Sequence, residues 1–392
     1  METLRCKALV AGGGPAGLAA AALLAHAGVD TICVSPAIVG DPRTVALMQP
    51  ALKMLERLGV WPGDIATSSA PLKQLHMVDD TGNLVAAPTL RFSAQELNLD
   101  CFGWNVPLEV LIPALRRVAE AAGVVFLAQR VIGAEHRGEH VLAKLEDGSQ
   151  VKAQVAVAAD GAHSVLRTAA DIGVEAWSFD QDALVTSFSH SVSHQDVSTE
   201  WHKAGGPFTT VPLPGRRSSL VWLDKPQRIS AKLEMDKAAL AQEIQLESYG
   251  TLGLVSGVAT PSRFSMRGVK AEKFAARRTL LVGEAAHVLP PVGAQGLNMS
   301  LRDAGHAVDV IVSANDPGAD DVMKAYHATR ISDVGPRQFA VNMMNRSLLS
   351  DMLPLHLLRA AGLAAVSAFP PLRALVMREG LAPSRDLPLS MR

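Results

Sequence analysis

The chain has 392 residues, 37 of them basic and 38 acidic. This length exceeds the size at which a single hydrophobic core stops growing, which predicts two domains. The near-neutral charge presents no basic face and argues against a nucleic-acid partner. Cys6, Cys33 and Cys101 form no C-x-x-C pair, which predicts neither a disulfide framework nor a zinc site. We expect Cys6 and Cys33 to be packed strand residues of a reduced protein.

No signal peptide precedes the first predicted strand, and no uninterrupted apolar run is long enough to span a bilayer. We therefore expect a cytoplasmic protein.

Residues 8–35 read ALVAGGGPAGLAAAALLAHAGVDTICVS, which predicts a buried strand, a glycine-rich turn, an alanine-rich helix and a second strand. Gly12, Gly14 and Gly17 fit G-x-G-x-x-G, the pattern that lets a pyrophosphate approach the backbone and a helix pack closely on a strand. The helix that begins near Pro15 would point its free N–H groups at the phosphates. This stretch predicts a dinucleotide site.

The second strand ends in Ser35, where such sites usually carry an acid that binds a ribose hydroxyl. Ser35 still offers one hydrogen bond, and the nearest acid, Asp41, lies in the loop that follows. The identity of the nucleotide has to come from other motifs.

Apolar spacing and turn residues predict the next elements in chain order. They are a helix at 44–58, a hairpin of 72–78 and 84–86, a helix at 107–122, and strands at 124–127, 140–145 and 151–159. Strands of alternating character then predict an antiparallel sheet, at 184–190, 197–202, 208–213 and 219–223. A helix at 236–249 and strands at 264–269 and 280–282 precede a helix at 296–314.

Two further motifs follow buried strands. Asp160 and Gly161 turn off the strand at 151–159, at the end where doubly wound sheets bind ligands. The strand at 280–282 runs into Gly283 and Glu284, and then into a proline–glycine loop and a helix whose N-terminus would stabilise negative charge.

In order and spacing, GGGPAG at 12–17, ADGAHSVLR at 159–167 and GEAAHVLPPVGAQGLN at 283–298 resemble the three motifs of the class A FAD-dependent aromatic hydroxylases. That family has the p-hydroxybenzoate hydroxylase fold. Within it, segments 41–61, 102–115 and 345–363 are most similar to the UbiH-type ubiquinone-biosynthesis hydroxylases. The resemblance covers essentially the whole chain.

The resemblance implies an α/β fold with a doubly wound, Rossmann-like FAD-binding domain, an inserted antiparallel-sheet substrate domain and a helical C-terminus. The implied bounds are 1–178 plus 270–335 for the FAD-binding domain, 179–269 for the substrate domain and 336–392 for the C-terminal segment, with hairpin 72–100 on the substrate side.

The resemblance also implies the FAD-binding residues, with Arg43 at the phosphate or ribitol, Asn105 near the flavin, Val131 beside the adenine and Asp160 in the motif associated with both FAD and reduced nicotinamide. The expected set is Gly12, Gly14, Pro15, Ala16, Gly17, Ser35, Arg43, Asn105, Val131, Asp160, Gly283, Glu284, Pro291, Gly293, Gln295, Gly296, Leu297 and Asn298. Glu284 stands where the family usually has aspartate.

The implied activity is a monooxygenase reaction in which NADPH or NADH reduces FAD, and oxygen then forms a C4a-hydroperoxyflavin that hydroxylates a phenol ring. The expected substrates are O2 and a polyprenylated phenol or quinol of ubiquinone biosynthesis. Two alternatives stay open: a hydroxylase of a small soluble aromatic, and a non-catalytic flavin-binding subunit of a biosynthetic complex.

His190, His194 and His202 recur along the predicted antiparallel strands. We expect hydrogen-bonded packing roles for them, with deprotonation of a phenol by one of them as the alternative. Glu284 and His287 match one half of a di-iron motif that needs two halves, so no metal is expected.

The stretch 348–377 is rich in Leu, Ala, Val and Pro, with arginines between its apolar patches. Such a segment suits peripheral contact with the inner-membrane surface or with a complex of Ubi proteins. A pair of helices packed on the protein's own core explains the same pattern.

Overall fold

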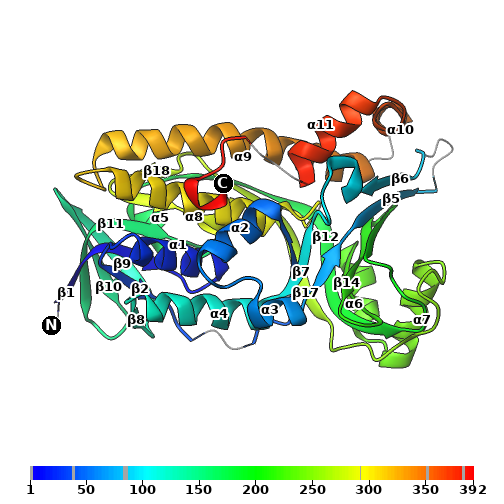
Figure 1. Ribbon diagram of the computed structural model, residues 1–392, viewed down its shortest axis with the longest axis horizontal. Helices are drawn as coiled ribbons and strands as arrows, with labels where there is room; N and C mark the ends of the chain where they lie inside the picture. Colours follow the sequence, from blue (N-terminus) through cyan, green and yellow to red (C-terminus); the bar gives the residue numbers. More distant parts are fainter. Residues whose placement is uncertain (1–2, 38–39, 83–86, 292, 350–352, 382–384) are drawn as a thin grey trace.

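The computed structural model describes all residues except 1–2, 38–39, 83–86, 292, 350–352 and 382–384 (Figure 1). Two large sheets, a small sheet and a layer of long helices make up the described part of the chain.

The first sheet contains the N-terminal strand–helix–strand unit, and its strands run in the order β18-β19-β11-β1-β2-β8, with β10 and β9 continuing from β11. Strands β19, β11, β1, β2 and β8 are parallel. The bounds are β1 Thr3–Ala11, β2 Thr31–Val34, β8 Val125–Leu127, β9 Val131–Arg137, β10 His140–Leu145, β11 Gln150–Ala158, β18 Ala275–Ala276 and β19 Thr279–Leu281. This parallel core confirms the predicted doubly wound fold.

Helices cover this sheet and share one apolar core with it. They are α1 Pro15–His26, α4 Leu108–Ala121, α5 Val165–Ala169, α8 Gln295–Ser313 and the long α9 Asp320–Leu349. Helix α1 packs on α8 and α4 through a face of small side chains, Ala16, Ala19 and Ala20 among them, which lets the helices approach closely. Cys6 on β1 and Cys33 on β2 are buried in this core, which confirms that both are packed strand residues, and burial raises the pKa of each thiol to about 12.

The second sheet has the order β20-β17-β12-β15-β14-β13-β5-β6, with β16 beside β12. Its pairs are antiparallel except for β13 with β5. The bounds are β5 Gln74–Asp80, β6 Leu90–Ser93, β12 Val174–His190, β13 Val197–Lys203, β14 Gly206–Leu213, β15 Arg217–Asp224, β16 Val255–Ser256, β17 Ser262–Ala271 and β20 His287–Val288. Helices α6 Pro226–Leu233 and α7 Lys237–Glu247 pack on its outer face (Figure 1), over Phe188, Phe208 and Trp222.

A small sheet of β3 Thr44–Met48, β7 Gly103–Pro107 and β4 Ala70–Leu72 lies between the large sheets. The short elements near it are α2 Gln49–Arg57, α3 Gly63–Thr67, the 3-10 turns η1 Ala94–Leu97 and η2 Gly283–Ala285, and η3 Leu389–Met391 at the C-terminus.

The predicted helix at 44–58 is wrong in its first turn and a half, which form strand β3 instead. Pro50 sits in the first turn of α2, where a proline is tolerated, and β-branched Thr44 and Val45 favour the extended chain that precedes it. The predicted strand at 84–86 lies outside the described residues, and β5 pairs with β6 at Leu90–Ser93. The sequence interpretation also missed β9 and the first half of β12.

The C-terminal stretch forms α10 Leu353–Ala368 and α11 Pro370–Leu381, which lie over β5 and β6 (Figure 1). Met377 is buried there against Phe92, while Phe369 and Leu375 are exposed. The two helices therefore pack on the protein and still present apolar side chains outward. Within the described ranges, no helix is both long and apolar enough to cross a membrane.

His306 on α8 predicts a loss of stability in mild acid. It donates from Nε2 to the carbonyl of Asp386 (2.9 Å), and burial lowers its pKa to about 4. Below about pH 6.5, His306 binds a proton in the unfolded chain but stays neutral in the folded protein. The free energy of unfolding therefore falls as the pH is lowered from about 6.5 to about 4. We expect His306→Gln to shrink this fall, measured by urea unfolding at pH 7.5 and 5; an unchanged difference between the two pH values would contradict the assignment.

Candidate active site

Four predicted site residues follow neighbouring parallel strands at the same edge of the first sheet. Ser35 follows β2, Gly12 follows β1, Asp160 follows β11, and Gly283 follows β19. The carboxyl ends of parallel strands are where open α/β sheets bind ligands. The fold thus brings together the three sequence motifs, which lie far apart in the chain.

The glycine-rich turn is closed by tight backbone contacts. A Cβ at Gly12, whose φ is +118°, would lie 2.0 Å from the carbonyl oxygen of Ala159. A Cβ at Gly17 would lie 2.1 Å from the carbonyl oxygen of Gly12. These two glycines are therefore required by packing alone.

Gly14 differs, because a Cβ there would meet no atom within 4 Å. It is the N-cap of α1, which continues through Pro15 and Ala16, and no side chain caps this helix end. Open space in front of uncapped N–H groups at a helix N-terminus fits a phosphate group.

Asp160 holds the second motif in place and keeps one oxygen free. Its Oδ2 accepts hydrogen bonds from the backbone N–H groups of Val165 (2.8 Å) and Leu166 (3.3 Å). Its Oδ1 is buried and has no partner among the described residues. A buried carboxylate oxygen without a donor is suited to a donor from a ligand. Arg167 joins this motif to the third one by donating to the carbonyl of Ala285 (2.9 Å).

Asp303 on α8 anchors the turn of the third motif. Its Oδ2 accepts from the N–H of Gly283 (3.0 Å) and from Nε2 of His287 (2.7 Å). Its Oδ1 accepts from Nε of Arg330 on α9 (2.7 Å). Burial raises the pKa of Asp303, but the charges of Arg330 and His287 outweigh this and hold it below its usual value. Sequence reasoning missed this anchor, although a lone acid on the apolar face of a predicted helix was a usable signal.

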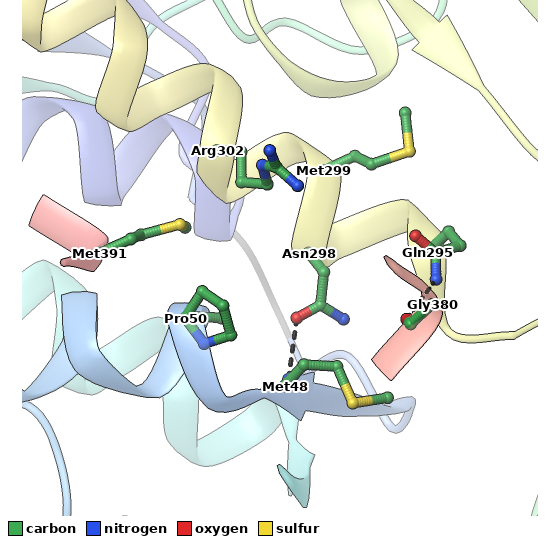
Figure 2. Close-up of a pocket in the computed structure, with 9 residues that line it drawn as sticks. Met48, Pro50, Gln295, Asn298, Met299, Arg302, Gly380 and Met391 are labelled. Atoms are coloured by element: carbon green, nitrogen blue, oxygen red, sulfur yellow. Dashed lines mark hydrogen bonds between the residues drawn. The ribbon is translucent and has the colours of Figure 1, made fainter. Parts of the chain in front are cut away.

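The third motif ends in the N-terminus of α8, which lies against β3. Gly293 and Ala294 take left-handed conformations, with φ of +65° and +55°, and turn the chain into the helix. Asn298 accepts from the N–H of Met48 (2.9 Å) and donates to the carbonyl of Ala46 (2.7 Å), so one amide binds β3 to α8 (Figure 2). No side chain caps α8, and its first turn holds the predicted residues Gln295, Gly296 and Leu297, with Pro291 exposed just before it.

A small pocket lies beside this helix end (Figure 2). Gln295 donates to the carbonyl of Gly380 (2.9 Å), so the end of α11 closes on α8. The lining residues are Met48, Pro50, Ala51, Gln295, Asn298, Met299, Arg302, Gly380 and Met391.

Arg43 lies where the two large sheets approach each other. Its guanidinium binds Asp41 and stacks over the ring of Phe264, 5.3 Å from the centroid. The hydrogen bond to Asp41, together with the charges of Asp41 and Glu284, outweighs partial burial and raises the pKa of Arg43. Asp41 is thus engaged with Arg43, while Glu284 is exposed at the turn.

Asn105 on β7 makes a second contact between the small sheet and the second large sheet. Its Nδ2 donates to the carbonyl of Pro212 (2.8 Å) and to Oγ of Ser219 (3.2 Å). Thr44 on β3 also contacts Ser219, with 2.9 Å between the hydroxyl oxygens. The face of the second sheet that carries Ser219 is therefore turned toward β3 and β7.

Ser35 is buried, and its hydroxyl donates to the carbonyl of Pro36 (2.9 Å). Its N–H donates to the carbonyl of Leu127 (3.0 Å), at the start of the segment that leads to Val131. Val131 is the half-buried first residue of β9.

The chain matches the FAD binding domain family over residues 5–335. It is 30% identical over 386 residues to "Ubiquinone hydroxylase UbiL" of Rhodospirillum rubrum, which covers 95% of this chain and 89% of that one. It is 31% identical over 334 residues to "3-demethoxyubiquinol 3-hydroxylase" of Escherichia coli, covering 83% of each. Among solved structures, p-nitrophenol 4-monooxygenase PnpA of Pseudomonas putida shares the fold, with a TM-score of 0.77, 19% identity and coverage of 98% of this chain and 100% of that one. The chain therefore belongs to the FAD binding domain family, as a class A FAD-dependent monooxygenase of the UbiH type.

Proposed function

We propose that this protein hydroxylates the aromatic ring of an uncharged, polyprenylated phenol or quinol in ubiquinone biosynthesis, using FAD, O2 and NADPH or NADH. The names of the two relatives support the reaction and the pathway. The substrate class is inferred from the side chains on one face of the second sheet, the face that is turned toward the carboxyl ends of the parallel strands of the first sheet.

FAD is proposed to lie across those strand ends. The uncapped end of α1 at Gly14 binds the pyrophosphate, Asp160 and Glu284 bind hydroxyl groups, and Pro291 together with residues 293–298 lies against the ring. When bound, the flavin supplies the electrons taken from NAD(P)H and the activation of O2. The residues of this chain orient the ring and exclude water from it.

The substrate is proposed to lie between that cofactor and the second sheet. Trp201, Phe208 and Trp222 face α6 and α7, so alternate positions of the same strands face the other way. There the register aligns one row across five strands, Met77, Glu200, Thr209, Val221 and Val185. Every member of this middle row is half-buried. Met77 packs at one end against a cluster that includes Phe92, and Val221 and Val185 pack at the other end against Leu223 and Met266. Glu200 and Thr209 form the partly accessible middle of the row, where the substrate ring is proposed to bind.

The middle row and its two flanking rows contain neither lysine nor arginine. The flanking rows are Leu75, Ser198, Val211, Ser219 and Ser187 on one side, and Asp79, His202, Pro207, Leu223 and Ala183 on the other. Two arginines lie beside these rows: Arg217 is exposed and contacts Oγ of Ser187 (3.5 Å), and Arg43 is bound to Asp41. A carboxylate held in front of the middle row would meet no cation from the three rows themselves, and its desolvation would cost on the order of several kcal/mol. The sheet face therefore favours a ring without an anionic group.

The test compares an uncharged short-tailed prenylphenol with 4-hydroxybenzoate at equal concentration, following NADPH oxidation and product. We expect substrate-stimulated oxidation and a hydroxylated product with the prenylphenol, and neither with the benzoate. Turnover of small tail-free aromatics alone would favour a catabolic hydroxylase. A protein that binds FAD but oxidises no NADPH would favour a non-catalytic subunit.

A peripheral contact with a membrane surface or a biosynthetic complex is proposed for the C-terminal helices. Phe369, between α10 and α11, and Leu375 and Val376 on α11 are exposed, and Phe339 is exposed on α9. Flotation with liposomes tests the membrane alternative: we expect Leu375→Glu together with Phe369→Glu to reduce flotation, and equal flotation of both proteins would contradict it.

A further inference from the structure

One carboxylate–imidazole pair lies on the sheet face assigned to the substrate. Glu200 is in the middle row, and His202 follows it on the same face of β13. Oε1 of Glu200 and Nε2 of His202 are 2.6 Å apart. The His202 side chain is 2% exposed and that of Glu200 is 14% exposed. The imidazole is thus enclosed, while the carboxylate is partly accessible on the sheet face assigned to the substrate.

The other two histidines of this region have local structural partners. His190 lies on the opposite face of β12, where Nδ1 donates to the carbonyl of Val192 (2.7 Å) and Nε2 contacts Oγ of Ser218 (3.0 Å). His194 donates from Nε2 to the carbonyl of Leu213 (2.9 Å) and accepts at Nδ1 from the N–H of Asp196 (3.0 Å). These contacts match the packing roles expected from the sequence. His194 also lies 3.9 Å from a carboxylate oxygen of Asp196, whereas His202 contacts its carboxylate partner, Glu200, at hydrogen-bond distance.

The surroundings of the pair are known from the strand register. Thr209 and Met77 flank Glu200, and Pro207 and Asp79 flank His202. Asp79 accepts from Thr81 and from the N–H of Ala87.

The charged neighbours Lys203, Asp80 and Glu247 lie on the other face of the sheet, where Lys203 binds both carboxylates. Among the residues that the structure describes, the side chain of Glu200 is hydrogen-bonded through Oε1, to His202, and Oε2 accepts no further hydrogen bond. No described cation at these register positions neutralises Glu200, so its free oxygen can accept a proton.

We infer that Glu200 is the catalytic base for the phenol hydroxyl and that His202 is the positioning residue that holds it. This inference rests on the proposed function. As the ring carbon bonds to the outer oxygen of the O2 that the bound cofactor would activate, the O–O bond breaks and its electron pair would stay on the oxygen left with the cofactor. In the same step the phenol O–H bond breaks, its electron pair forms the ring carbonyl, and the proton passes to Oε2 of Glu200. Loss of the proton from the hydroxylated carbon to water restores the aromatic ring, the carbonyl oxygen takes back the proton, and Glu200 is regenerated.

Positioned acid–base groups contribute about 10²–10⁴-fold to a rate. Glu200→Gln keeps the shape of the side chain and removes the base. We expect it to retain FAD and substrate-stimulated NADPH oxidation, while the ratio of product to NADPH consumed falls by about 100-fold and hydrogen peroxide replaces the product. Glu200→Asp retains a carboxylate and is expected to restore part of this ratio. His202→Gln should lower the ratio less than Glu200→Gln, and His190→Gln, the matched change on the opposite face, should leave it unchanged.

A ring-fluorinated prenylphenol that is already ionised at the assay pH separates proton transfer from structural support. Such a substrate needs no base, and in the wild type its negative charge would be repelled by the Glu200 carboxylate. At saturating concentrations of this phenol, Glu200→Gln is therefore expected to couple NADPH oxidation to hydroxylation at least as well as wild type. Equal loss with both phenols would overturn the inference, and so would a Glu200→Gln protein that hydroxylates the un-ionised phenol normally. A wild-type protein that forms no product from either phenol would overturn the proposed function and this inference with it.

Discussion

Replacing Gly14 by valine is expected to abolish FAD binding and to leave the fold intact. The backbone at Gly14 is extended, with φ of −70° and ψ of 171°, a conformation that valine adopts readily. A Cβ there meets no protein atom within 4 Å, so the valine side chain starts in the open space that is proposed for the pyrophosphate. We expect at least a ~100-fold loss of FAD affinity, about 2.8 kcal/mol. Fluorescence titration with FAD measures the affinity, and circular dichroism of the apoprotein checks the fold.

Gly17→Ala is the matched control within the same motif. Its Cβ would lie 2.1 Å from the carbonyl oxygen of Gly12, so helix α1 has to shift away from the turn. We expect this smaller side chain to lower both the stability of the apoprotein and the FAD affinity. A Gly14→Val protein that still binds one FAD per chain would contradict the proposed position of the pyrophosphate. A Gly14→Val protein that fails to fold would contradict the statement that the space beside Gly14 is free of protein atoms.

Asp303→Asn is expected to cost about 3–5 kcal/mol of unfolding free energy, because it removes one partner of a buried ion pair. The side chains of Asp303 and Arg330 are both 0% exposed. The amide removes one of the two carboxylates that face this buried guanidinium and leaves it with Asp333 alone (2.9 Å). The same change loosens the turn at Gly283 and is expected to weaken FAD binding. Urea unfolding of the apoprotein separates the stability effect from cofactor binding.

Asp309→Asn is the matched control on the same helix. Asp309 is half-buried and accepts one hydrogen bond, from the N–H of Leu389 (2.9 Å), so we expect a cost of about 1 kcal/mol or less. Since the pKa of Asp303 is held below its usual value, its contribution is present above the unfolded pKa, about 3.9, and is lost as the pH falls through the folded value. Equal stability of the two variants at pH 7 would contradict the anchoring role.

The sequence was sufficient to predict the glycine motif, the two later motifs and the alternating strands, because each of them depends on the chemistry of neighbouring residues in the chain. Gly12 has to be glycine for its own turn, and the strand at 208–213 alternates because its two faces meet different surroundings. The helix predicted over 44–58 failed where strand pairing between β3 and β7 outweighed local apolar spacing.

The contacts of Asp303 and Glu200 were beyond sequence reasoning, because they depend on register and on helix packing. Asp303 is anchored by Arg330 from a different helix. Glu200 faces the assigned substrate space only because β13 pairs with β14 in a register that places Trp201 beside Phe208. A one-residue slip of that strand would turn His202 and Glu200 toward α6 and α7.

Incorporation of ¹⁸O from labelled O2 into a short-tailed prenylphenol tests the central claim most directly. The purified protein, with FAD and NADPH, is supplied with ¹⁸O2 and the product is analysed by mass spectrometry. We predict one ¹⁸O atom in each product molecule, bound to a ring carbon, with about one NADPH oxidised per product, the stoichiometry of a flavin monooxygenase that excludes water from its site. Unlabelled product, or NADPH oxidation that yields only hydrogen peroxide with every phenol tested, would contradict the proposed ring hydroxylation.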